Sequence, residues 1–297
     1  MSRWLKIVGI LLATLVGAIA VLVMTLGLVS VARERRTYPV TPVTLTVPTD
    51  SSSIARGRHL ATALSGCMDC HGADLGGKLM GDDPLFGRLV SANLTRGRGG
   101  IGSTYSDADY VHAIRYGVGR DHHSLIFMPS DAFQAMSDAD LGSVIAFVKT
   151  MPPVDRELPR TRPGVLARAL HVAAGFPLLS AEGASRAAEA RRKLGGKHAP
   201  AAMTTVEYGE YLATAGGCRG CHGPDLAGAH CPNITPGVIG SWSETGFKTL
   251  LRKGVRPNGV QLSSEMPWQI FSNLTDEEMT AIYLFVRSVP AKAPKKS

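Results

Sequence analysis

Two segments of this chain, about half its length apart, repeat each other. Residues 57–77 read GRHLATALSGCMDCHGADLGG, and residues 209–228 read GEYLATAGGCRGCHGPDLAG with one residue deleted. Further on, ANLT at 92–95 matches PNIT at 232–235, and GIGSTYSDADYVHAIRYGV at 100–118 matches VIGSWSETGFKTLLRKGV at 238–255. Near the end of each copy, MSDADLGSVIAFVKTMP at 136–152 matches NLTDEEMTAIYLFVRSVP at 273–290. Self-similarity of this length predicts that the chain folds as two copies of one structural unit.

The repeat divides the 297 residues into two domains of ordinary size and two smaller regions. We expect an N-terminal anchor over residues 1–36, a first domain over 50–155, a linker over 156–202 and a second domain over 203–291. The linker contains GVLARALHVAAGF, expected to pack across the two domains or to touch a membrane surface. It also contains the polar SAEGASRAAEARRKLGG, expected to form an exposed helix.

Each copy is predicted to be mainly α-helical. Apolar residues at helical spacing lead into the cysteine motif, a shorter helix is expected over 107–116 and 244–253, and a longer helix ends each copy. Ser137 is placed to begin the last helix of the first copy, and Thr275 with Glu278 makes a capping-box pattern in the second. No strand-like alternation stands out. The first copy carries an insertion of about a dozen residues around 78–90.

Both copies contain the pattern CxxCH, which consists of Cys67, Cys70 and His71 in the first and Cys218, Cys221 and His222 in the second. This pattern is typical of haem c attachment, in which the two sulfurs bond to the porphyrin vinyl groups and the histidine binds the iron. A thioredoxin-like pair would need a βαβ context, and a zinc site would need both motifs to share one metal. The sequence therefore predicts two covalently bound haem c groups.

A methionine followed by proline recurs at the matching place in each copy. Met128 and Met266 lie on irregular segments before the last helix, and we expect them to be the sixth iron ligands. His122 and His123 are rivals for the first iron, but the second copy has no counterpart of either. Histidine–methionine ligation raises the reduction potential and leaves no open position, so such an iron passes electrons and does not bind substrate.

The N-terminus is long and apolar. Residues 7–31 contain neither charge nor proline, and a bilayer span needs about 20 apolar residues. Trp4 and Lys6 stand where interface anchors are found. A signal peptide cleaved after Ala32 is the alternative, although its apolar region would usually be about 7–15 residues long. Arginines flank both ends, so charge does not decide the orientation.

The five cysteines and the net charge of +8 exclude some other classes. A disulfide scaffold would be shorter and richer in cysteine. The positive charges are scattered and are not interleaved with aromatic residues, so a nucleic-acid partner is not expected. The four propionates of two haems would lower the formal balance to about +4.

The motifs CMDCH and CRGCH, the ANLT, PNIT, GIGSTYSD and VIGSWSE segments and the two Met-Pro pairs together carry a family resemblance. The chain resembles a tandem di-haem class I cytochrome c. It is similar to the cytochrome c subunits of membrane-bound bacterial dehydrogenases for alcohols, sugars and sugar acids. The resemblance covers nearly all of residues 50–290. Many of those relatives carry three haem domains, whereas this chain has two attachment motifs.

The resemblance also implies roles for other matched residues. Tyr105 and Trp242 align and are expected to hydrogen-bond haem propionates, and Arg115 and Arg252 align and are expected to neutralise them. The carbonyl of Pro232, or one near it, is expected to orient His222.

The implied function is a membrane-anchored di-haem electron carrier. It would relay single electrons from a dehydrogenase or quinol-oxidising partner to the respiratory chain and would not itself be an enzyme. Because haem c is attached on the outer side of the bacterial inner membrane, the resemblance places both domains in the periplasm. A di-haem enzyme, peroxidase-like or thiosulfate-oxidising, is the alternative, and a structural subunit is a third. Cys231 is expected to be an inert thiol, and an axial thiolate there would favour the enzyme.

Overall fold

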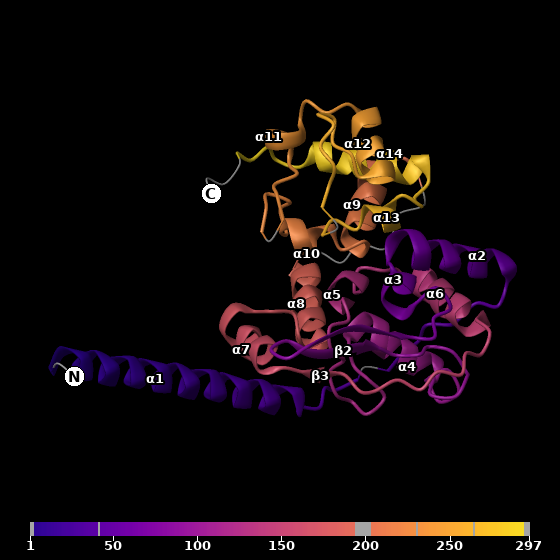
Figure 1. The fold of residues 1–297 in the computed structure, drawn as a ribbon. Helices are drawn as coiled ribbons and strands as arrows, with labels where there is room; N and C mark the ends of the chain where they lie inside the picture. The colour runs from indigo at the N-terminus through magenta and orange to yellow at the C-terminus, as the bar shows by residue number, and fades with distance from the viewer. Residues whose placement is uncertain (1–2, 41, 194–202, 230, 264, 294–297) are drawn as a thin grey trace.

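The computed structural model describes residues 3–40, 42–193, 203–229, 231–263 and 265–293, and within these parts the chain is mainly helical (Figure 1). Helix α1 (Arg3–Glu34) projects from the body as one long rod. Side chains along it, such as Leu11 and Val16, are more than half exposed. By length and composition α1 can cross a membrane.

The first half of the body comprises the elements between residues 51 and 150. In chain order these are α2 (Ser51–His59), η1 (Leu60–Leu64), α3 (Cys67–His71), β1 (Lys78–Asp83), β2 (Gly87–Ser91), α4 (Asp107–Val111), η2 (His112–Tyr116), α5 (Ser130–Phe133) and α6 (Asp138–Thr150). The elements η1 and η2 are single π-helical turns that continue α2 and α4.

The second half repeats the order of the helices without the strands and adds one short helix, α11. Its elements are α9 (Val206–Ala215), α10 (Cys218–His222), α11 (Pro236–Ile239), α12 (Glu244–Lys253), α13 (Trp268–Phe271) and α14 (Asp276–Ser288). The predicted capping box of Thr275 with Glu278 is confirmed, as is the N-cap role of Ser137. The shorter helix predicted over 244–253 has those bounds in the structure.

The backbone follows the same path in both halves. Pro129 and Pro267, which precede α5 and α13, both have φ −79° and ψ 54°. Leu75 and Leu226, three residues from the motif glycines, have positive φ values of 52° and 59°, which are unusual for leucine. Repeated uncommon dihedrals at matched positions are what a duplicated structural unit produces.

One matched glycine in each half fixes how the first and last helices cross. A Cβ added at Gly57 would lie 1.8 Å from the carbonyl oxygen of Ser143 in α6, and one added at Gly209 would lie 1.8 Å from that of Ala281 in α14. Only glycine allows the two helix backbones to approach so closely. Gly57 and Gly209 occupy the same position of the repeat, but the sequence alone does not show that two helices cross there.

The insertion in the first half forms a β-hairpin, which the sequence analysis did not predict. β1 and β2 pair antiparallel, and β3 (Arg162–Pro163) adds a third strand in the order β1-β2-β3. β1 is exposed along its whole length, and its register shifts between Leu79 and Gly81. An exposed, irregular strand has no buried face, so it leaves no alternating pattern in the sequence.

The segment expected to be a linker packs onto the first half over its described residues. α8 (Ser180–Lys193) is the predicted helix, and Ala181 and Ala184 bury one side of it against α5 and η2. Among the described elements, α7 (Val165–Ala174) packs chiefly along α1. Residues 194–202 lie outside the described parts.

The two halves meet through matched surfaces. Gly66, before the first cysteine motif, lies against Ile270 of α13, and Gly217, before the second, lies against Ala132 of α5. Ile270 follows Met266 by four residues, as Ala132 follows Met128. Each attachment motif therefore packs against the turn that follows the methionine of the other half, as in an isologous dimer interface.

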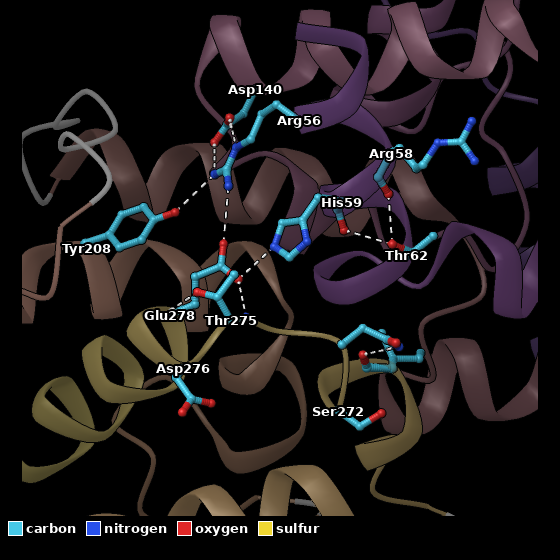
Figure 2. A network of polar contacts seen from close by, with 12 residues as sticks. Arg56, Arg58, His59, Thr62, Asp140, Tyr208, Ser272, Thr275, Asp276 and Glu278 are labelled. Carbon is cyan, nitrogen blue, oxygen red and sulfur yellow. Dashed lines mark hydrogen bonds and ion pairs between the residues drawn. The ribbon is translucent and has the colours of Figure 1, made fainter. Parts of the chain in front are cut away.

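A polar cluster lies in the same interface (Figure 2). Arg56 of α2 bonds to Asp140 of α6 at 3.0 Å, to Glu278 of α14 at 3.2 Å and to the Tyr208 hydroxyl at 3.1 Å. His59 lies 2.7 Å from Glu278. Such a cluster resists separation because removal of one partner would leave another charge buried without compensation.

The cluster also follows the repeat. Tyr211, which matches His59, donates its hydroxyl to Asp140 at 2.6 Å, and Asp140 matches Glu278. Each half therefore offers one carboxylate, three residues into its last helix, to a side chain from the first helix of the other half.

Candidate functional site

The two CxxCH motifs form equivalent one-turn helices, α3 and α10. Each follows a left-handed glycine, Gly66 with φ 60° and Gly217 with φ 79°, which lets the chain turn sharply into the motif. Burial raises the pKa of the Cys67 thiol to about 12 and that of Cys218 to about 11. The first cysteine of each motif is thus a neutral thiol facing the interior.

Both motif histidines are oriented by a main-chain carbonyl. His71 Nδ1 lies 2.8 Å from the oxygen of Ala92, and His222 Nδ1 lies 2.7 Å from the oxygen of Pro232. Since a carbonyl only accepts, Nδ1 carries the proton and Nε2 keeps a lone pair for a metal. Burial lowers the pKa of both imidazoles, which favours the neutral form that binds iron.

The contact of Pro232 with His222 is the one expected from the sequence, and it is confirmed. The equivalent role of Ala92 was missed. Its signal was present, because Ala92 and Pro232 are the first residues of the matched ANLT and PNIT segments.

The residues after each of these carbonyls hold it in place. Asn93 is buried and donates to the oxygen of Val154 at 2.7 Å, and it accepts from the amide of Thr95 at 2.9 Å. In the second half the Asn233 side chain donates to the main-chain oxygen of Lys292 at 2.9 Å. We name residues 92–95 and residues 232–235, whose first carbonyl orients the histidine, the carbonyl strap. The asparagine and threonine of each strap bond it to the segment that follows the last helix. A buried, satisfied polar network of this kind specifies one geometry.

In the first half the predicted ligands share one cavity. It measures about 730 Å³, counted out to its mouth, and Cys67, His71 and Met128 all line it. The remaining lining is apolar or aromatic apart from Ser65, and consists of Ala92, Leu94, Ile101, Tyr105, Tyr110, Ala113, Ile114, Leu125, Phe133, Met136, Val144 and Val148. An apolar cavity that contains a thiol, an oriented imidazole and a thioether fits a haem c.

Met266 occupies the corresponding turn of the second half. It is half-buried and packs against the core together with Cys218. Its carbonyl accepts from the amide of Trp268 at 2.7 Å, as that of Met128 accepts from Ser130 at 2.8 Å. The identical conformation of the following prolines places both methionines on the same kind of turn. Iron ligation by either methionine stays a prediction.

The two matched arginines have protein partners. Arg115 bonds to Asp138 at 2.6 Å and to the oxygen of Met136, and Arg252 bonds to Asp276 at 2.7 Å and to the oxygen of Ser272. They tie the shorter helix to the first turn of the last helix in each half. A haem propionate would have to share each arginine with these protein partners. Propionate binding by Arg115 and Arg252 stays a prediction.

The matched aromatic residues are placed differently from each other. Tyr105 lines the first cavity, and its ring packs edge-on against Tyr110 with centroids 5.5 Å apart. Trp242 is half-buried, and its carbonyl accepts from the Tyr283 hydroxyl at 3.1 Å. Their expected contacts with propionates also stay predictions.

His122 and His123 lie in an exposed loop that contacts the segment after α1. The amide of Tyr38 donates to the oxygen of His122 at 2.8 Å, and His123 pairs with Thr37. These backbone contacts give the two histidines a structural place in the loop.

Cys231 lies beside the second attachment motif. Its amide donates to the oxygen of Cys221 at 3.1 Å, and burial together with the neighbouring Cys221 thiol raises its pKa. The residue at the matching place in the first half is Ser91, whose hydroxyl donates to the oxygen of Cys70 at 2.6 Å. Cys231 thus neighbours an attachment cysteine and stays a neutral thiol.

Comparison with known proteins agrees with this site. The family model described as "Cytochrome c" matches residues 206–290. The chain is 30% identical to a "Diheme cytochrome c-type" protein of Cereibacter sphaeroides over 272 residues, which cover 80% of this chain and 86% of that protein.

Other relatives are longer than the region they share with this chain. The "Fructose dehydrogenase cytochrome subunit" of Gluconobacter japonicus is 30% identical over 84% of this chain, and the match spans 56% of that subunit. The "Gluconate 2-dehydrogenase cytochrome c subunit" of Pantoea cypripedii is 36% identical over 27% of this chain and 22% of its own length. The chain thus spans about half of the first relative and less of the second. With the cysteine motifs and their oriented histidines, the match along most of the di-haem protein shows that this chain belongs to the cytochrome c family.

Proposed function

We propose that this chain is a membrane-anchored carrier of single electrons with two class I cytochrome c domains, each holding one covalently attached haem c. The observation that carries the proposal is the recurrence, in both halves, of a CxxCH turn whose histidine is oriented by a main-chain carbonyl. Bound haem would supply one-electron redox chemistry at each site. The protein's own part is to hold Nε2 of each histidine available and to keep the surroundings apolar.

The interface between the halves supports relay between two haems. Each attachment motif packs against the methionine turn of the other half, and the cluster of Arg56, Asp140 and Glu278 holds the halves together. A fixed arrangement costs no reorganisation at the moment when an electron moves, which suits a carrier.

Membrane anchoring and partner choice belong to the same proposal. α1 would cross the bacterial inner membrane, and both domains would lie in the periplasm, where haem c is attached. Relatives named as cytochrome subunits of fructose, gluconate and alcohol dehydrogenases suggest a membrane-bound dehydrogenase as electron donor. The respiratory chain would be the acceptor.

Isolation of the full chain from native membranes in mild detergent tests this function. We expect a dehydrogenase subunit to co-purify, and an alcohol, sugar or sugar acid to reduce the covalent haem of the complex while leaving the separated chain oxidised. A separated chain that turned over peroxide or thiosulfate would show an enzyme instead and would contradict the proposal.

A further inference from the structure

Helix α7 lies at the level of the apolar part of α1. The uncharged stretch of residues 7–31 is about 37 Å long at about 1.5 Å per residue, which exceeds the roughly 30 Å of a bilayer's hydrocarbon core. The side chains of α1 that are partly covered begin inside this stretch and recur at helical spacing, at Val23, Leu26, Gly27, Ser30 and Val31. α7 packs against α1, so it is held beside the last turns of the apolar stretch.

The direction of α7 follows from one ion pair. Arg168, near the start of α7, bonds to Glu34 at the end of α1 at 2.5 Å. The rest of α7 therefore extends back along α1, and Figure 1 shows its connection to α8 as the part of the body that reaches farthest back along that helix. If α1 spans the bilayer, this connection lies at the membrane surface or below it.

The connection has the composition expected of such a place. Residues 172–179 read VAAGFPLL, without a charged or hydrogen-bonding side chain. Ala173, Ala174, Gly175 and Pro177 are exposed. Connections between surface helices are normally polar because they face water, and an apolar one indicates another environment.

Exposed apolar side chains from two other segments adjoin this connection. Leu85, Phe86 and Phe127 are 56%, 45% and 44% exposed. The Phe176 ring lies 6.3 Å from that of Phe86 and 5.8 Å from that of Phe127, between centroids. We name residues 173–177 with Leu85, Phe86 and Phe127 the apolar rim.

Backbone hydrogen bonds join the hairpin turn in the apolar rim to α7, and Asp82 and Asp83 beside this turn have partners. The amides of Gly164 and Leu166 donate to the oxygens of Phe86 and Leu85, which fixes the hairpin turn on the start of α7. Asp83 accepts from the amides of this turn, and Asp82 pairs with Arg88 at 2.8 Å. Arg35 and Arg36, exposed at the end of α1, suit anionic head groups.

We propose that the apolar rim lies in the interface of the phospholipid bilayer as a second, non-spanning membrane contact. It rests on the proposed anchoring by α1. Its consequence is that the first half is held against the membrane in one orientation, while the second half faces the aqueous space. The partner of the apolar rim is the lipid surface, because the rim lies beside α1, and the rest of α1 is apolar and not covered by protein.

Site-directed spin labelling of the full chain, haem included, in nanodiscs tests this proposal. In a Cys231→Ser background we would label Ala174→Cys and Leu85→Cys in the rim, Leu15→Cys in α1 and Val260→Cys in the second half. Leu15 and Val260 are both at least half exposed and serve as lipid and water references. The readout is the ratio of collisions with oxygen, which concentrates in lipid, to collisions with a water-soluble nickel complex.

We expect ratios at Ala174 and Leu85 to be several-fold higher than at Val260 and closer to that at Leu15. Rim labels that behave like Val260 while Leu15 reports lipid would overturn the rim proposal alone. Rim labels shielded from both reagents would mean that protein covers the surface, which overturns it too. A Leu15 label exposed to nickel would instead overturn the anchoring on which both proposals depend. An unchanged haem spectrum and circular dichroism confirm that each variant is folded.

Discussion

The two halves share a frame but differ in what surrounds the methionine turn. In the first half the amide of Met128 donates to the Ser180 hydroxyl at the start of α8, and the amide of Phe127 donates to the oxygen of Leu178. In the second half the amide of Met266 reaches the oxygen of Ser263 within its own loop, at 3.3 Å. Residues added between the copies thus support the methionine turn of the first half.

This difference shows what duplication conserves and what it leaves free. The CxxCH turn, the carbonyl strap and the crossing glycines recur because each performs the same local task in both halves. The hairpin lies in the first half, α8 packs onto that half, and α7 packs along α1. In the second half residues 257–261, which precede the methionine turn, are exposed.

The largest expected effect concerns the two methionines. Met266→Ala and Met128→Ala should each leave the haem of that half attached, because the thioether bonds do not involve methionine. Each should lower that haem's potential by a few tenths of a volt, within the range of about 0.8 V that axial ligands set. Redox titration measures the potential, and carbon monoxide binding shows whether loss of the methionine opens the iron.

The two methionine sites should also differ in how easily they open. In the unchanged protein, mild heat or denaturant should open the Met266 site to carbon monoxide before the Met128 site, because the segment between the copies bonds to the Met128 turn through Ser180 and Leu178. Simultaneous opening, or earlier opening in the first half, would contradict the proposed difference. Ser180→Ala should narrow the gap by weakening the first site.

The next effect concerns the matched glycines. Gly57→Ala and Gly209→Ala each force a methyl group against a helix backbone, and each should lower the free energy of unfolding by about 3 kcal/mol. Gly81→Ala is the control, since a Cβ there meets no atom within 4 Å. Denaturant unfolding followed by circular dichroism gives the values. A loss in only one of the two glycine variants would break the equivalence of the crossings.

These crossings show how far the sequence could predict the fold. The helices were predictable because Ser137, Thr275 and Glu278 cap them locally and because apolar residues recur at helical spacing. The hairpin was not, because β1 buries no face. The contact of α8 with the Met128 turn could not be predicted either. α8 is polar overall, and its sequence does not show which of its sides is buried.

The candidate site was predictable to a similar degree. Spacing singled out the cysteines and histidines and repetition singled out the methionines, and the structure brings Cys67, His71 and Met128 together in one cavity. Haem attachment and methionine ligation stay predictions. The role of Ala92 could have been predicted from its match to Pro232 in the repeat. The role of Asn93 could not, because it acts through a hydrogen bond to the oxygen of Val154, some sixty residues away.

A smaller effect is expected at the interface between the halves. Glu278→Gln removes the charge that faces Arg56 and His59 and should lower the free energy of unfolding by about 2 kcal/mol near neutral pH. Burial by itself would raise the pKa of this carboxyl, but hydrogen bonds from His59 and from the Thr275 amide outweigh it. The pKa is therefore below its ordinary value of 4.5.

The sign of the pH dependence follows from that shift. The carboxyl binds its proton less readily in the folded chain, so its contribution is full above pH 4.5 and is lost as the pH falls through the lower folded-state pKa. The stability difference between the wild type and Glu278→Gln should therefore shrink over this acidic range. A difference that stayed constant down to about pH 3 would show that the carboxylate charge is not the cause.

The smallest effect is expected where the halves differ by one atom. Cys231→Ser introduces the residue found at the matching place in the first half. It should change neither the haem content nor the two potentials, because Cys231 neighbours Cys221 and has the same place as Ser91, which donates to the oxygen of Cys70. A new spectrum or a shifted potential in this variant would make Cys231 a ligand and would revive the enzyme alternative.

The central claim is that each half carries one covalent haem c, and haem counting tests it most directly. Alkaline pyridine spectra of the purified full chain, set against protein determined by amino-acid analysis, should give two haems per chain that acidified acetone does not extract. Cys67→Ser with Cys70→Ser should leave one haem, and Cys218→Ser with Cys221→Ser should leave the other. A wild-type chain with one haem, or with haem that the solvent removes, would contradict the account.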